Sequence, residues 1–101
     1  MKAMSFELTS AARLDLLQIW NYFAELVSVD VADAMLFDLE SAMTKLSDRP
    51  GIGHRREDIT RRDLRFHLVG RYFVIYRPNT MPLRIIRVLH ASQNLKRIIK
   101  A

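Results

Sequence analysis

A chain of 101 residues with a net charge of +5 has room for one domain, and we expect a single domain over residues 1–101. Half of its residues are hydrophobic and 27% are charged, a balance that excludes an intrinsically disordered chain. The lack of cysteine excludes disulfides and thiolate metal sites. No apolar run reaches the roughly 18 residues of a membrane helix, and no apolar run follows Lys2 as it would in a secretory signal. We therefore expect a cytoplasmic protein without membrane contact.

The charge is divided unevenly between the two halves of the chain. Residues 1–50 carry four basic and eight acidic side chains, a net charge of −4, whereas residues 51–101 carry twelve basic and three acidic ones, a net charge of +9. A basic half indicates an anionic partner, either a nucleic acid or an acidic protein surface, although a merely solvated face gives the same pattern.

The N-terminal half predicts a strand followed by a helix. Residues 3–8 alternate apolar and polar side chains, as in a short half-buried strand. Thr9 or Ser10 can then cap a helix that reaches about Val27, because a hydroxyl there accepts a hydrogen bond from a free backbone N–H. The apolar stripe of this helix is wide, with Trp20 flanking Ala12, Leu16, Ile19, Phe23 and Leu26.

A second helix should follow almost at once. Asp30 is its expected cap, and its apolar stripe extends to about Leu46. Because only residues 28–30 separate the two helices, we expect an antiparallel helical hairpin. Phe37 points away from the apolar stripe, and an exposed aromatic side chain marks a partner surface.

The C-terminal half predicts a loop and three strands. Pro50-Gly51 and Gly53 end the helical pattern and open an irregular loop over residues 48–63. The strands are expected at residues 64–69, 72–77 and 83–90, and the last reads as a central strand because both of its faces are apolar apart from arginines. Residues 93–100 can form a short basic helix. The predicted fold is α+β, in the order β-α-α-β-β-β, with a helical hairpin packed on an antiparallel sheet and a short C-terminal helix.

Four sequence blocks form an ordered pattern along nearly the whole chain. They are Ala12, Asp15-Leu16, Ile19 and Tyr22; Leu46 with RPGIGHR at residues 49–55; Arg65 with YFVIY at residues 72–76; and IRVLH at residues 86–90. The set resembles the ParE branch of the RelE/ParE superfamily, the toxins of bacterial type II toxin–antitoxin systems. This resemblance implies the same fold and a cognate antitoxin as partner. From the exposed apolar patches and the basic face of the chain, we expect this antitoxin to supply an acidic segment.

The superfamily implies two possible targets. RelE-type members cut messenger RNA in the ribosomal A site, and ParE-type members poison DNA gyrase with no bond-breaking chemistry of their own established. RNA cleavage needs a base, an acid and cations for the phosphate. If the chain is a metal-independent endoribonuclease, Arg65, His67 and His90 are the catalytic candidates. However, Phe73 and Ala91 stand where the ribonuclease branch has arginines, and no tyrosine follows residue 92.

We therefore expect a gyrase inhibitor with no catalytic residues. A ribosome-dependent messenger-RNA endonuclease and a degenerate toxin that acts only as a basic binding module remain the alternatives. The residues expected to bind the target are the clustered cations Arg55, Arg56, Arg61, Arg62, Lys96 and Arg97. Trp20 and Phe37 are expected to bind the antitoxin, which should also cover the arginine loop.

Two arginines could also serve a structural role by forming ion pairs. Arg65 can pair with an acid such as Asp38 or Glu40, and Arg87, set among apolar neighbours, is expected in a buried ion pair. The three histidines lack carboxylate partners at metal-ligand spacing, so we expect no metal, and no motif indicates a cofactor.

Overall fold

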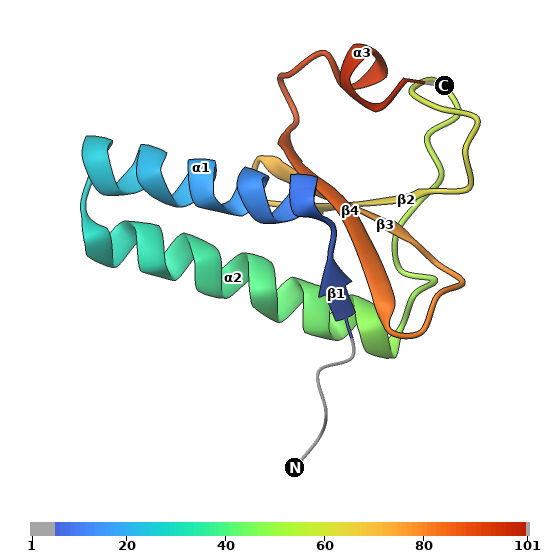
Figure 1. Cartoon of the computed structure of the whole chain (residues 1–101), viewed down its shortest axis with the longest axis horizontal. Helices are drawn as coiled ribbons and strands as arrows, with labels where there is room; N and C mark the ends of the chain where they lie inside the picture. Colours follow the sequence, from blue (N-terminus) through green and yellow to red (C-terminus); the bar gives the residue numbers. More distant parts are fainter. Residues whose placement is uncertain (1–5, 101) are drawn as a thin grey trace.

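Seven elements follow one another in the computed structural model, which describes residues 6–100 (Figure 1). They are β1 (Phe6–Leu8), α1 (Ser10–Leu26), α2 (Val29–Asp48), β2 (Arg65–Val69), β3 (Tyr72–Arg77), β4 (Leu83–His90) and α3 (Leu95–Ile99). This order confirms the predicted α+β fold with its helical hairpin. Residues 3–5 of the first predicted strand lie outside the described residues. Within residues 6–100, no helix is long and apolar enough to cross a bilayer.

The four strands form one sheet in the order β1-β4-β3-β2, so β4 is central as expected. The pairs β2–β3 and β3–β4 are antiparallel. The pair β1–β4 departs from the predicted antiparallel sheet, because Phe6 lies opposite Leu83 in a parallel register. The connection from β1 to β4 contains the helical hairpin, β2 and β3, so it is long enough for a parallel pair.

Hydroxyl side chains begin both long helices. The Thr9 hydroxyl accepts a hydrogen bond from the Ala12 backbone N–H at 3.0 Å, as predicted. In α2, the Ser28 hydroxyl accepts from the Val31 N–H at 3.1 Å. The prediction that Asp30 caps this helix was therefore wrong. Asp30 lies in the first turn, where a negative charge still favours the helix dipole.

Each face of the sheet has its own apolar core. The helical hairpin covers one face, where Leu39, Met43 and Tyr76 are completely buried. The loop between α2 and β2, together with α3, covers the other face and buries Ile59 and Leu95 against the strands. Figure 1 shows α1 and α2 side by side and antiparallel, with α3 away from them. The layer opposite the long helices thus comes from the basic half of the chain, which also supplies β2, β3 and β4.

Residues at and near the start of α1 form hydrogen bonds with the backbone of β4 beyond the point where β1 ends. The Thr9 N–H donates to the Ile85 carbonyl at 3.1 Å, and the Val88 N–H donates to the Asp15 carboxylate at 2.9 Å. Asp15 also accepts from Nε and Nη2 of Arg87 at 2.7 and 2.9 Å. This arrangement confirms the predicted ion pair of Arg87. It also provides hydrogen-bond partners for the part of β4 that has no neighbouring strand on this side.

Candidate functional site

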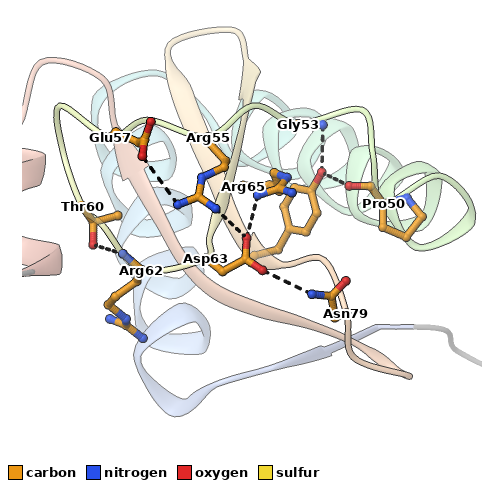
Figure 2. Close-up of polar contacts among 10 residues, drawn as sticks. Pro50, Gly53, Arg55, Glu57, Thr60, Arg62, Asp63, Arg65 and Asn79 are labelled. Atoms are coloured by element: carbon orange, nitrogen blue, oxygen red, sulfur yellow. Dashed lines mark hydrogen bonds and ion pairs between the residues drawn. The ribbon is translucent and has the colours of Figure 1, made fainter.

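The loop that carries four of the expected target-binding arginines is fixed to the sheet at Tyr76. The hydroxyl of this tyrosine donates to the Pro50 carbonyl at 2.7 Å and accepts from the Gly53 N–H at 2.8 Å (Figure 2). A two-hydrogen-bond bridge between His54 and Phe66 follows directly. The loop is therefore an ordered layer despite its lack of regular secondary structure.

Four side chains form a cluster that we call the Asp63 network: Arg55, Asp63, Arg65 and Asn79. The Asp63 carboxylate accepts from Nη1 of Arg65 at 2.7 Å and from Nδ2 of Asn79 at 3.2 Å, and it lies 3.6 Å from Nη1 of Arg55 (Figure 2). Arg65 thus pairs with Asp63 and not with Asp38 or Glu40. Nη2 of Arg55 also lies 3.9 Å from Oε2 of Glu57, so two carboxylates balance the two guanidinium groups (Figure 2).

The loop arginines differ in whether they form ion pairs within the described residues. Arg56 forms a bidentate pair with Asp58, at 2.9 and 2.8 Å, and its guanidinium lies 5.7 Å from the Phe73 ring centroid. Arg61 and Arg62, by contrast, make no ion pair with any residue in the range 6–100. Figure 2 shows the guanidinium of Arg62 pointing away from the Asp63 network. Arg61 and Arg62 are the loop arginines left for an external anion.

Helix α3 extends this basic layer. Leu95 and Ile99 anchor it in the second core, which leaves Lys96 and Arg97 exposed. The pKa of the Asp58 carboxyl is lowered chiefly by its hydrogen bond with Arg56, and the charge of Lys96 lowers it further. Lys96 therefore lies near the loop. We use the name basic surface for the side chains of Arg61, Arg62, Lys96 and Arg97.

The outer side of the helical hairpin is the second candidate surface. Trp20 on α1 donates from Nε1 to the Asp33 carboxylate on α2 at 2.9 Å, so it joins the two helices. Phe37 is 68% exposed, and Leu17 on α1 is 55% exposed. A shallow groove between the helices is lined by Leu17, Trp20 and Leu36 among others. Exposed apolar side chains beside a groove are typical of a surface that binds a helical segment.

The three ribonuclease candidates are not brought together. Arg65 and His67 lie on the edge strand β2, and His90 lies at the end of β4, with the whole of β3 between them. Two strand spacings amount to about 10 Å. Arg65 is engaged by Asp63, and the Nδ1 of His90 accepts from the Ser92 N–H at 3.0 Å. No compact acid–base pair results from these positions.

The comparisons with known proteins agree with this fold. A family model described as the ParE toxin of the type II toxin–antitoxin system parDE matches residues 6–95. The chain belongs to the ParE toxin family. The curated relative Toxin ParE1 from Caulobacter vibrioides is 31% identical over 91 residues, which cover 90% of this chain and 93% of the relative. The solved structure described as "Chromosomal ParDE TA system from P. aeruginosa" matches this chain with a TM-score of 0.74 at 19% identity. The match covers 88% of this chain and 97% of the solved chain, so the two share the same fold.

In this ParE-family chain, sequence reasoning missed two positions. Leu17 lies in the groove beside Trp20, and the wide apolar arc of the first helix was the signal that could have found it. Tyr72 was noticed only as part of a motif, yet it is 8% exposed and lines a cleft of about 890 Å³. Nothing in the local sequence separates such a tyrosine from a core residue.

His67 predicts a pH dependence of stability. Burial lowers its pKa, and the charges of Lys45 and His54 lower it further, so the folded protein binds this proton less readily than the unfolded chain. The resulting stability is present above the ordinary histidine pKa of about 6.5 and is lost as pH falls through the lower folded value. Melting temperatures between pH 5 and 7.5 should therefore fall more steeply with acid for the wild type than for His67→Gln. Equal slopes for the two proteins would contradict this assignment.

Proposed function

We propose that this ParE-family toxin acts by binding DNA gyrase and stalling it, without cleaving a bond, and that a cognate antitoxin neutralises it. The observation that carries the proposal is the contrast between the two sets of cationic residues. Arg65 and His67 on β2 are separated from His90 by β3, whereas Arg61 and Arg62 make no ion pair within residues 6–100 and share a layer with Lys96. Exposed and unpaired cations favour recognition of an anionic surface. With gyrase as its target, the protein acts in the cytoplasm.

The antitoxin is proposed to bind the outer side of the helical hairpin with an amphipathic helical segment. Leu17 and Phe37 supply exposed apolar contacts there, and Trp20 is held in place by Asp33. An acidic continuation of that segment would meet the basic surface by charge complementarity. The antitoxin and the target thus compete for the basic surface.

A ribosome-dependent endonuclease is the second candidate, and one observation favours it. Because burial lowers the pKa of His67, its imidazole is neutral near pH 7 and can accept a proton. Its distance from His90 across β3 is the argument against it.

A supercoiling assay tests the proposal. The purified toxin is titrated into gyrase, ATP and relaxed plasmid, with and without its antitoxin, and beside a translation reaction that reports messenger-RNA cleavage. We expect inhibited supercoiling, relief by the antitoxin and intact messenger RNA. RNA cleavage without gyrase inhibition would establish the endonuclease instead, and neither activity would leave a binding module.

Two variants give this assay residue-level resolution. Neutralising two exposed cations in Arg61→Gln/Arg62→Gln should raise the toxin concentration needed for inhibition by about tenfold. Phe37→Ser should inhibit as the wild type does but need about tenfold more antitoxin for relief, since it removes an exposed aromatic anchor. Arg84→Gln is the matched control, because Arg84 is an exposed cation paired with Glu7 outside both surfaces. Because the double variant removes two positive charges and the Arg84 variant one, an equal loss of affinity per charge removed would mean that only net charge matters.

A further inference from the structure

A cleft of about 890 Å³ lies between α1 and the end of the sheet where β3 begins and β4 ends. Its apolar wall comprises Ile19, Phe23, Met35, Val88 and Leu89. The rings of Tyr22, Phe23, Tyr72 and His90 succeed one another edge to face along this wall, with centroids 5.2, 6.4 and 5.1 Å apart. The volume suits a small ligand or two adjoining side chains of a peptide.

The polar groups of the cleft include the hydroxyl of Tyr72. The tyrosine is 8% exposed, and its hydroxyl makes no hydrogen bond to any residue in the range 6–100. Because no buried side-chain nitrogen or oxygen among these residues lacks a partner, the Tyr72 hydroxyl is open to solvent and can bond to a ligand. Nε and Nη2 of Arg87 donate to Asp15, and its Nη1 has no hydrogen-bond partner among residues 6–100. Arg71, in the turn between β2 and β3, also lines the cleft and makes no ion pair within the described residues.

These groups offer donors rather than acceptors. Burial raises the pKa of Tyr72, so its hydroxyl keeps its proton. The Nδ1 of His90 accepts from the Ser92 N–H, which places the proton of a neutral imidazole on Nε2. The charge of Asp15 is compensated by Arg87, so the charge left over in the cleft is that of Arg71. An acceptor with a negative charge is the complementary ligand.

We propose that the cleft binds a carboxylate carried next to an aromatic side chain, on an acidic peptide segment of the antitoxin. The carboxylate would accept from Tyr72 and Arg71, and the aromatic ring would extend the row of rings along the apolar wall. This assignment rests on the proposed function for its occupant. It adds a second contact point, on the side of α1 away from Trp20 and Phe37.

A peptide titration followed by amide NMR tests the cleft with the full ¹⁵N-labelled chain. The probes are N-acetyl-Phe-Glu-amide and its neutral counterpart N-acetyl-Phe-Gln-amide. We expect shifts confined to residues lining the cleft, and binding about tenfold weaker for the neutral peptide, the effect of one charge-assisted hydrogen bond. Tyr72→Phe and Arg71→Gln should each weaken the acidic peptide by a similar factor, whereas Arg84→Gln should not.

Three outcomes would overturn the assignment: equal binding of the two peptides, shifts outside the cleft, or tighter binding of the dinucleotide UpU at the same residues. The last would indicate a nucleic-acid site. Gyrase inhibition by Tyr72→Phe is measured in parallel. If inhibition persists while no variant changes peptide binding, the cleft assignment fails and the gyrase proposal stands. If inhibition is absent in every protein, the peptide result still decides whether the cleft takes a carboxylate.

Discussion

Replacing Asp15 with alanine should lower the free energy of unfolding by about 3–5 kcal/mol, the usual effect of removing one partner of a buried ion pair. The Asp15 side chain is 7% exposed, and it accepts hydrogen bonds from both the Arg87 guanidinium and the Val88 backbone. Its loss leaves a largely buried cation and a buried N–H without partners. Urea unfolding monitored by circular dichroism at pH 7 measures the change.

The double variant Asp15→Ala/Arg87→Met separates charge from packing. Because methionine removes the uncompensated cation, this variant should recover much of the stability lost by Asp15→Ala, although the Val88 N–H remains unpaired. A loss below about 1 kcal/mol in the single variant, within the range of exposed pairs, would show that the ion pair is solvent-screened.

Replacing Gly53 with alanine should destabilise the protein by about 1–3 kcal/mol, the range for overpacking a close-packed site. An added Cβ would lie 2.5 Å from the Tyr76 hydroxyl oxygen and 3.0 Å from Cβ of Arg65. Tyr76 is completely buried and its hydroxyl is bonded to the Pro50 carbonyl, so the ring has no room to move aside. Thermal and urea unfolding measure the loss.

The chain contains a matched control two residues away. A Cβ added at Gly51 meets nothing within 4 Å, and Gly51 does not need positive φ, so Gly51→Ala should be neutral or stabilising by up to about 1 kcal/mol. Tyr76→Phe removes the oxygen that the new methyl group meets. Adding Gly53→Ala to Tyr76→Phe should therefore cost less than adding it to the wild type. An equal loss from both glycine substitutions would mean that general loop flexibility, not the contact with Tyr76, decides the effect.

Most of the fold was predictable because side-chain periodicity encodes it. The two helical stripes and the strands ending at Val69, Arg77 and His90 follow from spacing alone. The parallel register of β1 against β4 does not, because it joins segments 77 residues apart and local patterns carry no information about such pairing. The choice of Ser28 over Asp30 as helix cap depends on how the chain enters α2, since either side chain can accept the bond.

The candidate site was predictable only at the level of residue type. The sequence showed a cluster of arginines, but it did not show which of them form ion pairs and which form none within the described residues. Arg56 and Arg65 pair with acids two residues away, which sequence spacing could have suggested. The hydroxyl of Tyr72, which has no hydrogen-bond partner within residues 6–100, lies in the cleft between α1 and the sheet, so only the tertiary structure reveals it.

The unequal covering of the two sheet faces has a consequence for local opening. Two long helices cover one face, whereas the other is covered by a loop without regular secondary structure and by a helix of five residues. We expect amides in this thinner layer to exchange with solvent through fluctuations that leave the helical hairpin folded. The cations proposed to meet the target lie on this layer, so adjusting their positions to a partner would demand no global unfolding.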